Sequence, residues 1–178
     1  MSTKIHDMVR IALMAAVICI LGPLSVPVGP VPISLSNFAV ILSVYLLGLK
    51  RGTISCIVYI LLGLFGLPIF SGFQGGIGKL FGVTGGYIFG YIFLAVFTGI
   101  FVEKYSSNYL FQFLGMVIGN ILCYVFGTVW FVFLTKMNLA EAVAICVVPF
   151  ILGDVIKMLV ALFAGNKIRK RIILANLY

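Results

Sequence analysis

One uncharged segment settles the class of this protein, and it reads Thr84-Gly-Gly-Tyr-Ile-Phe-Gly-Tyr-Ile-Phe-Leu-Ala-Val-Phe-Thr-Gly-Ile-Phe-Val102. A helix needs about 20 predominantly apolar residues to cross a bilayer, so this segment is long enough to span one. The whole chain of 178 residues has the same character, since 63% of its residues are hydrophobic and only 9% are charged. A soluble domain cannot bury that much hydrocarbon. The composition therefore predicts an all-α polytopic membrane protein.

On either side of this segment, apolar runs bounded by Gly, Pro and charge predict six transmembrane helices in a single domain of residues 1–178. The six spans lie near residues 10–27, 33–49, 52–68, 84–102, 108–135 and 149–168. Between the first two spans, Pro27, Pro30 and Pro32 resist helix and predict a compact apolar turn. Residues 136–148 predict a loop with room for a short interfacial helix, and Pro149 suits the first turn of the last span.

The basic residues segregate between the two sides of the predicted bundle, which sets its orientation. Two of them, Lys79 and Lys136, lie on one side, and Lys157 lies inside a span. The other nine share the opposite side and are Lys4, Arg10, Lys50, Arg51, Lys104, Lys167, Arg169, Lys170 and Arg171. The positive-inside rule then predicts that both termini are cytoplasmic and that the Pro-rich loop, residues 71–86 and residues 136–148 face outward as a pocket mouth. The net charge of +8 is then explained by contact with anionic lipid headgroups, not by nucleic-acid binding.

Two ionisable residues share the last predicted span, in the motif Gly153-Asp-Val-Ile-Lys157. Asp154 and Lys157 are three residues apart, so a helix places them on one face where they can pair. Charges at membrane depth are costly unless they face a cavity or a partner. The pair is thus either the centre of a ligand site or an ion pair that locks helices together. Small residues around the charges, among them Pro149 and Gly153, favour the ligand site.

A glycine-rich segment over residues 70–87 offers a second set of polar groups. It differs from a phosphate-binding P-loop, because Phe73 replaces the first glycine and Leu80 replaces the hydroxyl residue after Lys79. Its glycines permit close backbone approach to a ligand, and Gln74, Lys79, Thr84 and Tyr87 supply hydrogen-bonding groups. The alternative is a flexible outer loop.

Small residues repeat at four-residue spacing in three spans. The repeats are Gly82, Gly86 and Gly90, then Gly115 and Gly119, and a weaker pair, Ala12 and Ala16. The glycines predict close helix packing among the last three spans. The alanines in the first span predict either internal packing or contact with a membrane partner.

Catalysis finds little support in the sequence. The single histidine, His6, precedes the first span, the four acidic residues are scattered, and the four cysteines lie singly in apolar runs. No nucleophile or metal-ligand pattern assembles from them, so we expect no enzyme, no cofactor and no metal. Active transport by this chain would need an external motor.

The motifs together resemble the BioY proteins, the biotin-binding S components of energy-coupling factor (ECF) vitamin transporters. The resemblance spans the chain, through Val31-Pro-Ile-Ser-Leu35, Gly63-Leu-Phe-Gly-Leu-Pro68, Gly82-Val-Thr-Gly-Gly-Tyr87 and Pro149-Phe-Ile-Leu-Gly-Asp-Val-Ile-Lys157. The chain departs from the family in having Val83 where Pro is usual and Ser36 where Gln is often found. Ser36 is the ligand contact expected at this position.

The resemblance implies the six-helix S-component fold in the plasma membrane of a prokaryote, with a pocket beneath the outward loops. It implies docking through Ala12 and Ala16 onto an EcfT-like transmembrane coupling protein that carries two ATPases. On this analogy the S component topples in the membrane and delivers biotin inward while ATP is hydrolysed elsewhere.

The same resemblance assigns the polar residues to parts of biotin. Asp154 and Lys157 would read the ureido ring, and Phe70, Phe73 or Tyr87 would contact the apolar rings. Gln74, Lys79 or backbone amides of the glycine segment, such as those of Gly75 and Gly86, would hold the carboxylate.

Three other functions make different predictions about the polar residues of this chain. An S component for cationic thiamin would be expected to carry extra acidic residues and an aromatic cage. A facilitator that works without partners would need a continuous polar path, yet we find nothing comparable to Asp154 and Lys157 in the predicted cytoplasmic half. A membrane scaffold would tolerate loss of both charges.

Overall fold

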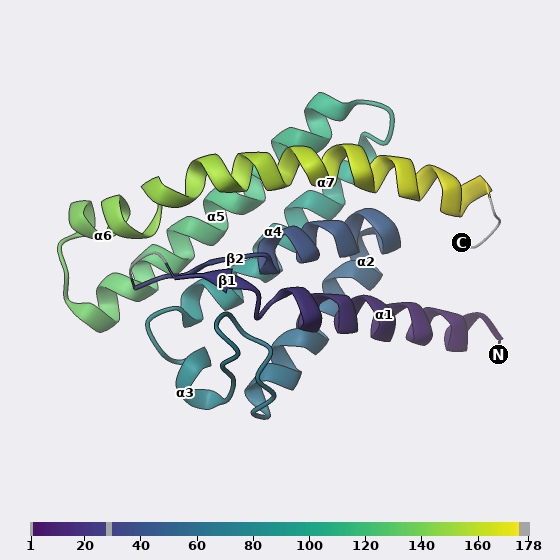
Figure 1. Cartoon of the computed structure of the whole chain (residues 1–178). Coiled ribbons are helices and arrows are strands. Elements are labelled where there is room, and N and C mark those ends of the chain that lie inside the picture. Colours follow the sequence, from purple (N-terminus) through teal and green to yellow (C-terminus); the bar gives the residue numbers. More distant parts are fainter. Residues whose placement is uncertain (1, 28–29, 175–178) are drawn as a thin grey trace.

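The computed structural model describes residues 2–27 and 30–174, and this part of the chain forms seven helices and a two-stranded antiparallel sheet (Figure 1). The elements are α1 (Ser2–Leu21), β1 (Ser25–Val26), β2 (Ile33–Ser34), α2 (Ser36–Leu64), α3 (Ile77–Leu80), α4 (Gly85–Lys104), α5 (Tyr109–Thr135), α6 (Leu139–Cys146) and α7 (Val148–Leu174). In the sheet, Ser25 pairs with Ser34 and Val26 with Ile33.

Four of these helices, α2, α4, α5 and α7, are long and apolar enough to cross a membrane. The chain is accordingly a multi-pass helical membrane protein. The first helix begins and ends earlier than the predicted span, because α1 starts at Ser2 and stops at Leu21, just before Gly22 and Pro23. Residues 136–148 contain the helix α6, in the place where the sequence left room for one. The number of spans stays a prediction, as does the assignment of residues 1–178 to one transmembrane domain.

The second and third predicted spans are the two halves of α2, which is broken at Gly48. Gly48 has φ 81° and ψ 177°, a backbone conformation that suits glycine. A Cβ atom on Gly52 would lie 2.6 Å from the Cα of Val44. In a straight helix these two residues would be about 12 Å apart, so the chain bends sharply between them. The backbone N–H of Leu49 donates to Oε1 of Glu103 at 2.7 Å, which caps the start of the second half.

Glycines bring α4 and α5 into close contact, as the four-residue spacing predicted. A Cβ atom on Gly86 would lie 2.4 Å from the Cβ of Trp130 and 3.1 Å from the Cα of Gly127. One helical turn further along, Gly90 packs against Cys123 in the same way. These two helices therefore form one tightly packed wall of the bundle.

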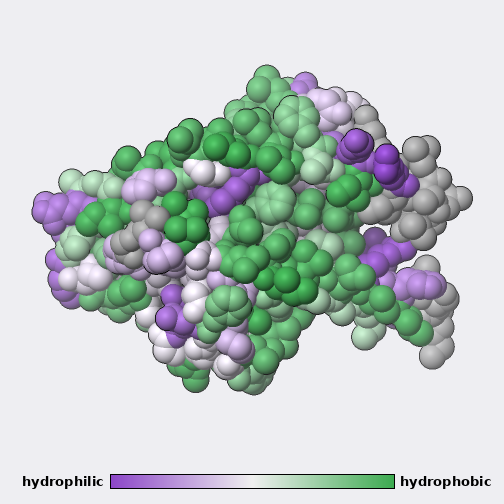
Figure 2. Space-filling view, viewed as in Figure 1, coloured by the Kyte–Doolittle hydropathy of each residue, from purple (hydrophilic) through white to green (hydrophobic). Residues whose placement is uncertain are grey.

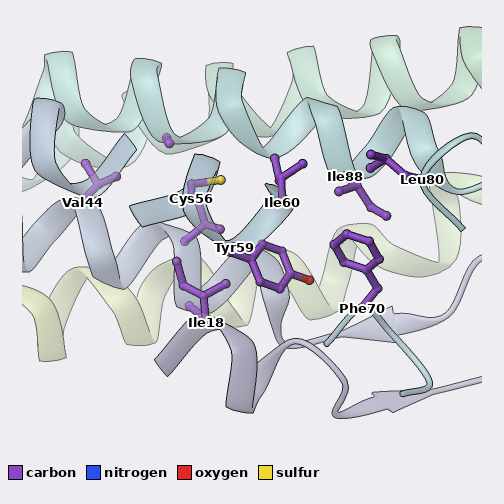
Figure 3. Close-up of a cluster of buried hydrophobic side chains, with 11 residues drawn as sticks. Ile18, Val44, Cys56, Tyr59, Ile60, Phe70, Leu80 and Ile88 are labelled. Atoms are coloured by element: carbon purple, nitrogen blue, oxygen red, sulfur yellow. The ribbon is translucent and has the colours of Figure 1, made fainter. Parts of the chain in front are cut away.

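A hydrophobic core joins α1, α2 and α4 with the segment that follows α2 (Figure 3). Its aromatic centre is an edge-to-face pair, Tyr59 and Phe70, whose ring centroids are 5.4 Å apart. Ile18 and Ile88 pack around this pair from α1 and α4. The core fixes the glycine-rich segment onto the helices beneath it.

The two ends of the bundle are polar, and the middle of the visible face is mostly hydrophobic (Figure 2). At one end lie the start of α1, the bend of α2 and the end of α7 (Figure 1), and Asp7 pairs there with Arg51 at 3.0 Å. The sheet, α3 and α6 lie toward the opposite end. This arrangement groups the basic residues as the sequence analysis expected, while the direction of the bundle across the membrane stays a prediction.

A cluster of buried, uncharged polar side chains near the α2 bend was not predicted from the sequence. Within the spans, the prediction relied on charged residues. Gln112 accepts hydrogen bonds from Tyr45 at 3.0 Å and from Asn166 at 2.8 Å. Its amide group donates to the backbone carbonyls of Tyr105 and Ser106. These groups satisfy one another, so the cluster joins α2, α5 and α7.

Candidate ligand-binding site

The carboxylate of Asp154 is the centre of a buried hydrogen-bond network between α5 and α7. Only 3% of Asp154 is exposed. Its Oδ2 accepts hydrogen bonds from the Tyr124 hydroxyl and, at 3.5 Å, from the Asn120 amide. Its Oδ1 lies 3.0 Å from Nζ of Lys157. The predicted pairing of Asp154 with Lys157 is confirmed, and two partners from α5 complete it.

Lys157 ties this network to the beginning of α2. Its Nζ donates to the backbone carbonyl of Ser34 at 2.6 Å and to Oδ1 of Asn37 at 3.2 Å. With Asp154 these make three acceptors, which match the three N–H donors of an ammonium group. Residues more than a hundred positions apart in the sequence thus meet at one charged side chain.

A small cavity of about 50 Å³ lies against this network. Its lining combines aromatic, amide and charged side chains, namely Val31, Pro32, Ser34, Asn37, Tyr87, Tyr91, Asn120, Cys123, Tyr124, Cys146, Phe150, Asp154 and Lys157. The volume is far below the roughly 300 Å³ of an ordinary ligand pocket. Tyr87 lines it as expected, with its hydroxyl 2.9 Å from that of Thr128. Pro149 is exposed, and its neighbour Phe150 lines the cavity instead. We call this cavity the inner hollow.

A second hollow, of about 460 Å³, lies over the glycine-rich segment. We call it the outer hollow, and it is lined by Pro30, Gln74, Gly75, Gly78, Lys79, Gly82, Val83 and Thr84. Three of the expected ligand residues, Gln74, Gly75 and Lys79, therefore lie together there. Burial lowers the pKa of the Lys79 ammonium from its ordinary value. The Thr84 hydroxyl is buried and has no hydrogen-bond partner among the described residues.

The two hollows lie on either side of a short stretch of the Pro-rich loop. Pro30 lines the outer hollow, and the next two residues, Val31 and Pro32, line the inner one. At the start of α4, Thr84 lines the outer hollow and Tyr87, one helical turn later, lines the inner one. The hollows are neighbours that this loop separates.

Four residues expected to contact a ligand line neither hollow, and one of them, Phe73, is 67% exposed. Phe70 is fully buried in the core against Tyr59 (Figure 3). Gly86 lies in the contact between α4 and α5, where Trp130 covers it. Ser36 is 1% exposed, and its hydroxyl donates to the carbonyl of Gly22 behind the inner hollow.

The amide and hydroxyl partners of the charged pair were not predicted from the sequence. Asn120 could have been predicted as a site residue. Burying an amide side chain in an otherwise apolar span is energetically unfavourable, so such a residue indicates a functional role. Tyr124 lies four residues later and so shares its helix face. Asn37 and Ser34 gave no such signal, because their role depends on where α2 begins relative to α7.

Comparison with known proteins identifies the family. The sequence model of the BioY family matches residues 1–173. The chain belongs to the BioY family. Among its relatives, "Biotin transporter BioY2" of Lactococcus lactis is 32% identical over 169 residues, which cover 94% of this chain and 93% of the relative. "Biotin transporter BioY" of Thermotoga maritima is 36% identical over 165 residues, which cover 93% and 96%.

The fold of this BioY family member matches a solved structure as well. That structure is the crystal structure of the "S-component for biotin from an ECF-type ABC transporter". The two chains superpose with a TM-score of 0.87 at 32% sequence identity, over 95% of this chain and 93% of the other. The expected resemblance to BioY and the S-component fold are thereby confirmed. Relatives named as transporters also agree with the expectation that this BioY protein is not an enzyme.

Proposed function

We propose that this chain is the high-affinity biotin-binding S component of an ECF-type vitamin transporter in the plasma membrane of a prokaryote. The observation that carries the proposal is the buried pair of Asp154 and Lys157 on the wall of the inner hollow, in a chain with the fold of a biotin S component. Six spans with both termini in the cytoplasm would turn the two hollows outward.

The inner hollow suits the ureido ring of biotin. This ring has N–H donors beside a carbonyl acceptor, and the hollow offers the Asp154 carboxylate beside the Lys157 ammonium. Tyr87 and Phe150 provide apolar surface for the fused rings, and burial of such surface contributes about 25 cal/mol per Å². Because the cavity is small, binding requires Val31 and Pro32 to move apart from α4 and α7.

The outer hollow suits the biotin carboxylate. Lys79 offers a positive charge, and Gln74 and Thr84 offer hydrogen-bond donors around it. The ligand would then lie with its ring under the Pro-rich loop and its valerate chain passing Val31 toward Lys79. Asp154 balances Lys157 in the inner hollow, whereas Lys79 in the outer hollow has no acidic residue beside it in the lining, and this favours an anionic vitamin over cationic thiamin.

A stripe of residues on α1 that is exposed on the surface of the bundle suits a membrane partner. Ala12 and Ala16 are exposed, and Met8 and Leu13 beside them are 68% and 60% exposed. Small residues in such a stripe allow another helix to approach closely. We assign this face to an EcfT-like coupling protein, which would link the chain to two ATPases and supply the motor that transport needs.

Isothermal titration of biotin into the purified protein tests the proposal, with thiamin and riboflavin titrated under identical conditions. We expect one biotin to bind per chain, tightly, and neither of the other vitamins to bind. Binding of thiamin or riboflavin in place of biotin would assign the chain to another substrate. Absence of heat with all three at two different temperatures, from protein with intact helical circular dichroism, would favour a scaffold.

A further inference from the structure

A large apolar groove runs between α5 and α7 on the side away from the α2 core, and α6 covers one of its ends. Its volume is about 590 Å³. On α7 it is lined by Ile151, Val155 and Met158, which recur at helical spacing, and Val147 lines it just before α7 begins. Asp154 and Lys157 belong to the neighbouring face of the same helix, which borders the inner hollow.

The groove presents hydrocarbon almost throughout. The polar side chains that border it are Asn120, Tyr124 and Thr128. Asn120 and Tyr124 donate to Asp154, and Thr128 bonds with the Tyr87 hydroxyl, so their polar atoms are engaged on the inner side. Both α5 and α7 are long, apolar membrane spans, so the groove lies at the depth of the lipid tails. Water would be unfavourable there, whereas an acyl chain would bury its own hydrocarbon.

A positively charged side chain, that of Lys136, lies near one end of this groove. Lys136 is the left-handed cap directly after α5, and it lies in the chain between Val129 and Leu139, which both line the groove. The Lys136 side chain is exposed, and its Nζ lies 4.7 Å from the centroid of the Phe133 ring. Among the described residues, no carboxylate forms an ion pair with it. An ammonium beside an apolar groove complements a lipid that has a negative headgroup and a long tail.

We propose that the groove between α5 and α7 holds one acyl chain of an anionic phospholipid whose phosphate pairs with Lys136. The chain would lie against Asn120 and Tyr124, which form a wall common to the groove and the inner hollow. This site is independent of the proposed vitamin specificity, because none of its contacts involves the vitamin.

The test uses two matched substitutions on α7. Val155 lines the groove, whereas Val160 is 50% exposed and does not line it. Phosphatidylglycerol is titrated into delipidated protein in neutral detergent, and bound lipids are counted by native mass spectrometry. We expect the unaltered chain and Val160→Phe to bind one lipid alike, and Val155→Phe to bind it about tenfold more weakly, because the larger ring fills the groove. Equal binding by Val155→Phe and Val160→Phe would overturn the groove as the site.

The headgroup is tested with a surface variant that leaves the groove intact. Lys136→Gln removes the charge from an exposed position. We expect it to lose the preference for phosphatidylglycerol over phosphatidylethanolamine that the unaltered chain has. A preference that persists in Lys136→Gln would overturn the assignment of the phosphate to this lysine. Biotin is absent from both titrations, so their outcome does not depend on whether biotin is the substrate.

Discussion

The carboxylate of Asp154 accepts hydrogen bonds from side chains on two helices, and its charge balances that of Lys157. Replacing Asp154 by Asn keeps its size but turns an acceptor-only group into an amide and leaves the lysine charge unbalanced. We therefore expect Asp154→Asn to weaken biotin binding by about tenfold or more, which corresponds to about 1.4 kcal/mol. Isothermal titration measures this loss.

The matched control for this change is Glu141→Gln, an acid-to-amide substitution at an exposed position of α6. It should bind biotin as the unaltered chain does. Unchanged affinity of Asp154→Asn, in protein with a normal unfolding transition, would remove the inner hollow from consideration as the ring site.

Lys79 is the residue through which the ligand carboxylate can be tested separately from the ring. We expect Lys79→Met to bind biotin about fivefold more weakly and to bind biotin methyl ester with unaltered affinity, because the ester has no charge to lose. Competition titrations with both ligands measure the two affinities. Lys104→Met is the control. Lys104 is the last residue of α4, at the end away from the outer hollow, so this change should alter neither affinity. Equal weakening for acid and ester would show that Lys79 acts on the fold and not on the carboxylate.

Burial of Lys79 also predicts how the carboxylate preference depends on pH. The protonated ammonium attracts the carboxylate, and burial lowers its pKa below the ordinary value of 10.5. The preference for biotin over its methyl ester should therefore be full near neutral pH and decline as the pH rises, before an exposed lysine would titrate. Titrations between pH 7 and about 10 follow this ratio. A ratio that stays constant over this range in the unaltered chain, or that declines equally in Lys79→Met, would contradict the role of Lys79.

The charged pair could be predicted from the sequence because both residues lie on one helix, three positions apart. Their partners Tyr124 and Asn37 could not be predicted in the same way, since they come from α5 and α2 and only the packing of the helices brings them to α7. The same reason explains why Gly86 and Phe70 were placed at the ligand. A glycine motif has the same pattern whether its helix faces a ligand or, as here, Trp130.

Among the elements, the bend in α2 depends most directly on one residue. Gly48 adopts φ 81°, and a Cβ atom there would lie 2.6 Å from Oε1 of Glu103. Gly48→Ala should destabilise the protein by about 1–3 kcal/mol, because alanine is strained in this conformation and displaces the carboxylate that caps Leu49. Thermal unfolding in detergent, followed by circular dichroism, measures the change as a lower midpoint.

Gly153→Ala provides the control for this substitution. Gly153 lies within α7 beside open space, and a Cβ atom added there would meet no neighbouring group within 4 Å. Alanine there should leave the midpoint unchanged or raise it slightly. A midpoint for Gly48→Ala equal to that of the unaltered chain would mean that the bend does not depend on this glycine.

Most helices could be predicted because hydrophobic length and proline positions are local properties. The end of α1 was predicted too late, although Gly22 and Pro23 directly after Leu21 are a local signal for it. The break in α2 could be expected near Lys50 and Arg51, but not the sharpness of its bend, which brings Gly52 back beside Val44. That geometry depends on Glu103, which is distant in the sequence.

At the scale of the whole molecule, the proposed ligand site and the proposed docking face lie on different elements. The hollows lie near the sheet and α3, whereas Ala12 and Ala16 are exposed on α1. Replacing both alanines by Trp should abolish uptake of radiolabelled biotin by cells that carry the coupling protein and ATPases, because the large rings block close helix approach. Biotin affinity of the purified variant should remain unaltered. Normal uptake by a normally expressed variant would move the docking face elsewhere.

The polar groups of Asp154 and Lys157 already have hydrogen-bond partners within the protein, and this limits what new hydrogen bonds to a ligand can contribute to the binding free energy. A ureido ring that enters exchanges these bonds for new ones of similar strength, with little net enthalpy. The gain then comes from removing apolar surface from water, and its thermodynamic signature is a negative change in heat capacity on binding. The heat of titration should accordingly become more exothermic as the temperature is raised.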